Sequence, residues 1–439
     1  MKDTPIPNSI VKAKIAETGI ENVGKATIRE IVRLVSEIEN ASGQKFIRME
    51  MGVPGLEPSE FGVNAEIAAL KKGVAQFYPI IDGLPELKIE TSKFVKNFMN
   101  VDVDKKCCIP TVGSMQGGMA SFLVANRCQA QKDTVLFIDP GFPVQKQQLK
   151  VLGMKYETFD VYNFRGPKLK EKLESYLKKG NISTIIYSNP NNPSWICFTD
   201  TELQTIGELA TKYDTIVIED LAYFAMDFRK DLSKPGKPPY QVSVANYTDN
   251  WIMLISSSKA FSYAGQRIGS LVISDKLFDR QYPDLKRYFA SDRFGFSIIY
   301  GAVYSLSSGT SHSAQYGLAA MLKAANEGKL DFVDVVRVYG ERAKSMKKLF
   351  TSYGFKIVYD MDEDKPLADG FYFTISYPGF TGGELIEKLL YYGISAISLG
   401  ITGSERTEGL RACVSQTHPD QFADLEFRLK CFQEDHPLN

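Results

Sequence analysis

Five short apolar runs follow one another through the middle of the chain, and most are separated by segments long enough to form a helix. The runs are apolar at nearly every position, which is typical of strands that are buried on both faces. Strands of that kind alternate with helices in proteins whose mostly parallel sheet is covered by helices. We therefore expect an α/β fold with strands at TVLFI (134–138), STIIYS (183–188), TIVIE (215–219), WIMLIS (251–256) and IGSLVIS (268–274).

The two ends of the chain have a different pattern. Apolar residues of the segment 27–38 recur at helical spacing, which indicates an amphipathic helix. Two charged stretches, 340–353 and 383–392, also indicate helices, and each is followed directly by a glycine that can end a helix. The pattern predicts a large domain over residues 50–320 and a smaller α+β domain formed by an N-terminal arm, 1–49, and residues 321–439.

Charge and hydropathy exclude two classes of partner. Lys and Arg together number 52, as do Asp and Glu, so the formal net charge is zero and no binding to nucleic acid or to an anionic membrane is expected. The longest uncharged run, 294–322, is interrupted by Ser, Gly, Thr, Gln and His, which indicates buried interior rather than a membrane span. The N-terminal segment is charged and has no apolar core typical of a signal peptide, so we expect a cytoplasmic protein.

Cysteine and histidine show no pattern typical of a metal site or of a disulfide framework. The six cysteines are spread over the chain without a CxxC pair, and the three histidines have neither ligand nor triad spacing. We expect no metal, so another group must carry the chemistry.

The segment SSSKAFSYAGQRIG, from Ser256 to Gly269, places Lys259 in a loop of small residues directly after the run WIMLIS. A lysine at the end of a buried strand is partly desolvated, which lowers its pKa toward that of a nucleophilic amine. Such an amine is suited to forming an imine with a carbonyl. Taken alone, an exposed lysine in a polar loop is the simpler interpretation.

Four further motifs of the same region add polar and aromatic side chains. TIVIEDLAYF brings Asp220 and Tyr223 to the carboxyl end of a strand, where open α/β sheets bind ligands, although an acid there is also a common helix N-cap. NPNNPS offers Asn192 from a turn after a strand. TVGSMQGG places Ser114 at a helix start that attracts phosphate, and DPGFP places Phe142 where it stacks on a planar ring or packs in the core.

In order and spacing these motifs resemble the fold type I pyridoxal-phosphate enzymes, and among them the class I and II aminotransferases such as the aspartate and aromatic aminotransferases. The resemblance implies that Lys259 forms a Schiff base with pyridoxal 5′-phosphate and that Arg267 binds its phosphate. It also implies that Asp220 pairs with the pyridine nitrogen, and that Tyr223 and Asn192 hydrogen-bond the 3′-oxygen. The implied cofactor contacts are Ser114, Met115, Phe142, Asn192, Asp220, Tyr223, Ser256, Ser258, Lys259, Arg267 and Tyr78.

The resemblance further implies substrate contacts. Arg411 in GLRACVS resembles the arginine that binds the substrate α-carboxylate, together with Asn192 and Gly52. Arg293 in SDRFGFS stands where dicarboxylate-specific relatives have a second arginine, although surface pairing with Asp292 is an alternative.

Two other positions bear on assembly and on the site entrance. Tyr78 resembles the tyrosine that reaches the phosphate of the neighbouring subunit's cofactor, which implies a homodimer. Trp195 stands where the family's NPTG motif has glycine, which implies an altered entrance.

We therefore expect an aminotransferase that moves an amino group from an amino acid to a 2-oxo acid by a ping-pong mechanism, with Lys259, Asp220 and Tyr223 as catalytic residues. The cofactor motifs do not determine which bond at the α-carbon is broken, so a lyase or decarboxylase of the same fold is an alternative. A cofactor-sensing regulator is a third interpretation, but the residues ahead of the family-like region leave little room for a DNA-binding module.

Overall fold

The computed structural model describes residues 4–438, and its chain forms two compact units. The sheet unit consists of Leu56–Pro190 and Cys197–Val336. The terminal unit consists of the described residues up to Gly55, the short segment Asn191–Ile196, and the described residues from Arg337 onward. The expected domain limits at 49/50 and 320/321 stay a prediction, because a compact unit of contacts is not by itself an independently folding domain.

The sheet unit contains a seven-stranded, mostly parallel sheet, which confirms the predicted α/β fold. Only β8 runs antiparallel to its two neighbours, β2 and β7. Each of the predicted apolar runs forms a strand. The order across the sheet is β2 (Cys108–Thr111), β8 (Gly269–Ile273), β7 (Trp251–Ser256), β6 (Ile216–Leu221), β5 (Ile182–Ser188), β3 (Thr134–Asp139) and β4 (Lys155–Asp160).

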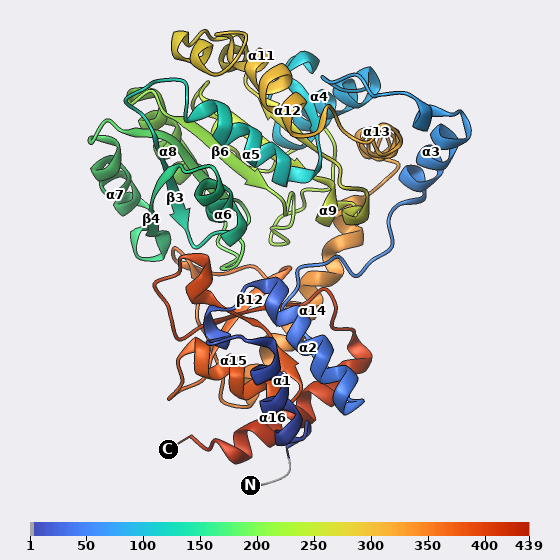
Figure 1. Ribbon diagram of the computed structural model, residues 1–439, viewed down its shortest axis with the longest axis vertical. Helices are drawn as coiled ribbons and strands as arrows, with labels where there is room; N and C mark the ends of the chain where they lie inside the picture. The colour runs from blue at the N-terminus through green and yellow to red at the C-terminus, as the bar shows by residue number, and fades with distance from the viewer. Residues whose placement is uncertain (1–3, 439) are drawn as a thin grey trace. The chain divides into compact units, whose positions relative to one another are not determined.

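Helices pack on this sheet and on one another (Figure 1). The helix α5 (Gly113–Ala125) lies against β7 and β8, and Gly117 allows this close approach because a Cβ there would lie 3.0 Å from Leu254 Cδ2. The helix α13 (His312–Asn326) packs against two helices from earlier in the chain. The other helices of this unit are α3 (Glu60–Lys71), α4 (Pro85–Met99), α6 (Pro143–Val151), α7 (Pro167–Leu177), α8 (Asp200–Lys212), α9 (Ser257–Ala260), α10 (Asp275–Asp279), α11 (Phe294–Phe296) and α12 (Tyr304–Ser307).

The uncharged run 294–322 forms α11, a π-helical segment (Ser297–Val303), α12 and the first part of α13. Much of the run is buried, as expected. However, Phe296, Tyr300 and Tyr304, spaced four residues apart, are exposed, so one side of this helical stretch departs from the expectation of buried interior. Among the described residues, no helix combines the length and apolar character that crossing a membrane requires.

The terminal unit is built around a four-stranded antiparallel sheet in the order β14 (Ile397–Ser398), β15 (Leu410–Cys413), β12 (Tyr372–Ser376) and β9 (Lys356–Ile357). Two short pairs add to it: β1 (Ile47–Arg48) with β13 (Ile394–Ser395), and β10 (Met361–Asp362) with β11 (Lys365–Pro366). Its helices are α1 (Asn8–Thr18), α2 (Ile28–Ser42), α14 (Phe332–Ser352, whose first turn is counted with the sheet unit), α15 (Gly382–Tyr391) and α16 (Phe422–Asp435).

The predicted terminal helices begin and end for recognisable reasons. Thr27 and Thr381 each form a capping box with the glutamate three residues later, which satisfies free N–H groups at the starts of α2 and α15. Gly354 and Gly393, which follow α14 and α15, have positive φ, as the sequence pattern predicts.

Candidate active site

The carboxyl ends of β5, β6 and β7 bring several of the predicted residues to one edge of the sheet. Ser188 at the end of β5 pairs with Asp220 on β6, and β7 ends at Ser256. Lys259 follows three residues later, in the single helical turn α9 rather than in the predicted loop. The next residue but one, Phe261, is buried and packs against Phe332 with ring centroids 4.9 Å apart, which anchors the turn that carries the lysine.

Asp220 is a buried carboxylate at this edge. Burial raises its pKa to about 6, while hydrogen bonds from Gln145 and Ala222 and the positive charge of Lys259 oppose that rise. Gln145 Nε2 donates to Asp220 Oδ2 at 2.8 Å, and the Ala222 N–H donates to Oδ1 at 3.2 Å. The site therefore holds an acid that a further cationic group would stabilise in its ionised form.

Gln145 was not predicted from the sequence. It lies in the first turn of α6, which begins directly after the half-buried Phe142, and this helix start brings an amide donor to Asp220. A glutamine in a helix has no local sequence signal for such a role. Tyr223, which follows β6, is buried close to the same strand end.

The start of α5 forms a cradle beside Arg267. Gly113 has φ +63°, and a Cβ at that position would lie 2.6 Å from Arg267 Nη2. A Cβ on Gly269, the first residue of β8, would lie 3.3 Å from the Ser114 amide nitrogen. Free N–H groups at a helix start next to an arginine form a binding site for an anion such as phosphate.

The other residues predicted to bind the phosphate lie in the same part of the sheet unit. Ser256 Oγ accepts a hydrogen bond from the Ser258 N–H at 3.2 Å, and Ser256 pairs in the sheet with Gly269. Met115 lies in the first turn of α5, and its carbonyl accepts a hydrogen bond from Gln148 at 2.9 Å. The structure thus brings Ser114, Met115, Ser256, Ser258 and Arg267 into one part of the sheet unit.

Arg411 lies in the terminal unit, on β15, and only 1% of its surface is exposed. Its Nη1 donates to Asn192 Oδ1 at 3.3 Å and its Nη2 to the Glu50 carbonyl at 2.5 Å. No described residue forms an ion pair with it, and its Nε–H has no partner among them. The nearby carboxylate of Glu50 is already bound by Arg48 at 2.7 Å and by Ser395 at 2.6 Å.

A buried guanidinium without a carboxylate partner is costly, so Arg411 is prepared for an anion from outside the chain. The substrate contact predicted for Gly52 stays a prediction. A Cβ on Gly52 would overlap the hydroxyl of Tyr372, so glycine makes room for that ring.

Tyr78 is 90% exposed. It lines an open hollow of about 470 Å³ with neighbouring residues 75–79 and with 311–313. Its predicted contact with a second subunit stays a prediction.

Arg293 lies at the opposite edge of the sheet from Asp220. Its backbone forms an isolated β-bridge with Gln281. Arg280, the residue before Gln281, donates from Nη1 to Oδ1 of Asp214 at 2.6 Å, and Asp214 lies just before the amino end of β6. Figure 1 shows α11, which begins directly after Arg293, well away from α9. Arg293 is exposed, and its predicted role in binding a distal carboxylate stays a prediction. The alternative pairing with Asp292 is not formed, because Asp292 pairs with Lys286 at 3.1 Å.

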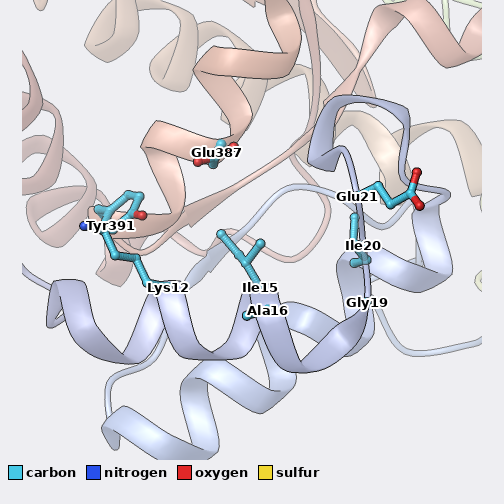
Figure 2. A pocket seen from close by; sticks show the side chains of 8 residues that line it. All are labelled: Lys12, Ile15, Ala16, Gly19, Ile20, Glu21, Glu387 and Tyr391. Carbon is cyan, nitrogen blue, oxygen red and sulfur yellow. The ribbon is translucent and has the colours of Figure 1, made fainter.

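A further hollow of about 410 Å³ lies in the terminal unit, between α1 and α15. Figure 2 shows Ile15 of α1 directed toward the helix that carries Glu387 and Tyr391. Its charged lining residues, Lys12, Glu21 and Glu387, are all exposed, and none of its residues belongs to the predicted site. The hollow is a surface groove between two helices.

Comparison with known proteins identifies the family of the chain. The model of the family "Aminotransferase class I and II" matches residues 44–421. A probable aspartate aminotransferase of Methanocaldococcus jannaschii is 27% identical over 257 residues, which cover 58% of this chain and 63% of the relative. An LL-diaminopimelate aminotransferase of Natranaerobius thermophilus is 28% identical over 244 residues, covering 54% of this chain and 60% of the relative. Both matches thus span somewhat less than two thirds of the relatives' length.

Solved structures share the fold over nearly the whole chain. The aspartate aminotransferase of Thermotoga maritima has a TM-score of 0.74 at 18% identity, covering 96% of this chain and 99% of that one. The alanine aminotransferase of Pyrococcus furiosus has a TM-score of 0.73 at 19% identity, covering 95% and 99%. The chain belongs to the class I and II aminotransferase family and has its fold type I architecture.

Proposed function

We propose that this protein is a pyridoxal-phosphate-dependent aminotransferase that moves an amino group from an amino acid to a 2-oxo acid in two half-reactions. The observation that carries the proposal is the buried Asp220 at the end of β6, whose pKa is raised to about 6 and whose environment includes the charge of Lys259. An acid held in this way is suited to stabilising a protonated ring nitrogen.

The residues present fit this cofactor. When bound, pyridoxal phosphate supplies an aldehyde that combines with amino groups and a ring that withdraws electrons from the substrate α-carbon. Asp220 would stabilise a proton on the ring nitrogen, and Phe142 would supply an aromatic surface for the ring. Lys259 would hold the cofactor through its amine, and that amine would serve as the base at the substrate α-carbon. Tyr223 and Asn192 would supply hydrogen-bond donors for the 3′-oxygen.

The phosphate is bound by the cradle at the start of α5. The backbone N–H groups of Ser114 and Met115 and the side chains of Ser256, Ser258 and Arg267 supply donors and positive charge. The observation that supports this assignment is Gly113, which leaves open the space beside Arg267 Nη2 that a Cβ would take.

Arg411 binds the α-carboxylate of the amino acid or of the 2-oxo acid. Its buried guanidinium has no ion-pair partner among the described residues, and a planar fork of N–H donors matches a carboxylate bidentately. Both substrates of a transaminase, the amino acid and the 2-oxo acid, carry a carboxylate that can pair with Arg411.

We also propose a homodimer in the cytoplasm. The exposed Tyr78 supports a subunit contact, because a largely bare aromatic ring favours burial against a partner. None of the six cysteines, all in the described part of the chain, forms a disulfide, which is typical of a reducing compartment. Light scattering tests the dimer, and a fully active monomer would contradict it.

The decisive experiment locates the covalent attachment. The protein is loaded with pyridoxal phosphate and treated with borohydride, and the modified peptide is identified by mass spectrometry. We expect modification of Lys259 and none in Lys259→Ala. Lys276→Ala serves as the matched control, since Lys276 is exposed and pairs with Asp249 at 2.7 Å. Attachment at another lysine, or full turnover by Lys259→Ala, would contradict the proposal.

A panel of amino donors separates transamination from its rivals. A transaminase converts each accepted donor to its 2-oxo acid and leaves the amino group on the enzyme until a second 2-oxo acid arrives. Release of carbon dioxide in the first half-reaction would instead indicate a decarboxylase, and release of ammonia a lyase.

A further inference from the structure

Two buried aromatic rings of the terminal unit form a row that ends at Arg411. The guanidinium carbon of Arg411 lies 4.5 Å from the ring centroid of Tyr372, over the face of the ring. The ring of Trp195 packs edge-to-face with that of Tyr372, with ring centroids 6.2 Å apart and an interplanar angle of 71°. Trp195, Tyr372 and Arg411 are all buried, so water does not weaken these contacts.

The strand register explains the first contact. Tyr372 of β12 pairs with Cys413 of β15, and Thr374 pairs with Arg411. Side chains two residues apart on a strand share a face, so Tyr372 and Arg411 are diagonal neighbours on one face of the sheet. Long side chains reach one another at that separation, and the flat guanidinium lies on the flat ring.

Two glycines make room for the rings. A Cβ on Gly370 would overlap the indole of Trp195, and a Cβ on Gly52 would overlap the hydroxyl of Tyr372. Any other residue at either position would push a ring away from its present place. The local sequence is therefore adapted to both rings.

Trp195 holds its place at a conformational cost. Its φ is +65°, in the left-handed region that a bulky residue rarely adopts and that glycine adopts freely. In the NPTG motif that this segment resembles, the same position is a glycine. A strained tryptophan where glycine is comfortable indicates that its side chain contributes something that offsets the strain.

We propose that Tyr372 fixes the plane of the Arg411 guanidinium and that Trp195 is a positioning residue that acts through Tyr372. The ring occupies the face of the guanidinium, while its edge, which carries the N–H groups, stays available. Asn192 and the Glu50 carbonyl take one bond each from that edge, and Nε–H has no partner among the described residues. Fixing the plane aims the remaining donors at a carboxylate, so the inference rests on the proposed role of Arg411 in carboxylate binding.

The test measures binding of maleate, a dicarboxylate without an amino group, to the cofactor-loaded protein. Removing a buried cation–π contact in Tyr372→Leu weakens maleate binding about tenfold, and Tyr372→Phe, which keeps the ring, binds close to wild type. The matched control is Tyr359→Leu, because Tyr359 is a buried tyrosine of the same unit that contacts Arg406 instead. The control loses stability but keeps maleate affinity.

Trp195→Gly tests the second step. It relieves the strained backbone and removes the ring, so we expect KM for amino donors to rise several-fold while kcat changes little, because a carboxylate contact is made equally in the ground and transition states. A purely structural role for the rings predicts lower thermal stability with unchanged KM and maleate affinity, and that result would overturn the inference.

Arg411→Gln separates this inference from the proposed function. If maleate binding is lost in Arg411→Gln but unchanged in both Tyr372→Leu and Trp195→Gly, the aromatic row is not a positioning device while the role of Arg411 stands. If Arg411→Gln binds maleate like the wild type, the proposed function of Arg411 fails first, and the inference with it.

Discussion

Glu219 offers a sharp test of how burial shifts an acid in this fold. It precedes Asp220 on β6, so the two side chains point to opposite faces of the sheet. Its carboxylate is fully buried and accepts hydrogen bonds from Tyr187 Oη at 3.0 Å and from Ser243 Oγ at 2.6 Å. Burial nevertheless dominates and raises the pKa of Glu219 from 4.5 to about 7.

The consequence is a loss of stability as pH rises. A folded state with the higher pKa binds the proton more tightly than the unfolded chain, so the contribution of Glu219 is fully present below pH 4.5 and is lost as pH rises through about 7. A pKa change of this size corresponds to about 3 kcal/mol of unfolding free energy. Glu219→Gln removes this dependence, at a cost of roughly 1–3 kcal/mol that does not vary with pH, because its NH₂ group faces hydrogen-bond donors.

The measurement is urea unfolding of the wild type and of Glu219→Gln at pH 4.5 and at pH 7.5. We expect the stability of the variant relative to wild type to improve by about 3 kcal/mol between the two pH values. Asp139 and Asp220, whose pKa values burial also raises, are present in both proteins and cancel in the difference. Tyr187→Phe removes one hydrogen-bond donor to the Glu219 carboxylate, so the stability of this variant should fall more strongly with rising pH. An equal stability difference at both pH values would refute the reasoning.

Three further outcomes follow from the site. Asp220→Asn slows turnover at least roughly hundredfold, and a wild-type rate in this variant would show that Asp220 is a structural cap. In the wild type, cofactor affinity falls as pH drops through about 6, and absorbance titrations of the variant should show no such fall. Gly113→Ala places a methyl group 2.6 Å from Arg267 Nη2 at φ +63°, so it costs about 1 kcal/mol of stability in thermal unfolding and weakens cofactor binding; unchanged affinity would remove the phosphate from this cradle. Arg293→Ala leaves kcat/KM unchanged for glutamate and for an aromatic donor alike, because the side chain is exposed. A loss of kcat/KM for glutamate alone would instead indicate that Arg293 binds a distal carboxylate.

The strands that the apolar pattern predicted are those whose burial is complete on both faces. β3, β5, β6, β7 and β8 are buried at every position, and each contains a run of apolar residues that the sequence pattern detects. β4 begins exposed and becomes buried only at its end, and β2 has four residues with a proline among them, so neither has a periodic signal. Edge strands at the two sides of the sheet are therefore the ones that the pattern missed.

The candidate site was predictable where chemistry is concentrated in a local motif. Lys259, Asp220 and the start of α5 each follow or precede a strong element signal. Gln145 and Tyr372 have no such signal, because their partners lie far away in the sequence and only the fold brings them together. Arg293 forms a bridge with Gln281, and its predicted role at a distal carboxylate stays a prediction.

The chain has two tryptophans, and each compact unit holds one of them: Trp195 in the terminal unit and Trp251 in the sheet unit. Both are buried, so each fluoresces from an apolar environment that is lost only when its own unit opens. Replacing Trp251 with Phe leaves a protein whose emission reports on the terminal unit alone, and replacing Trp195 with Phe leaves the opposite reporter. Denaturation curves of the two single-tryptophan proteins would coincide if the units melt as one cooperative block, and would separate if one of them melts first.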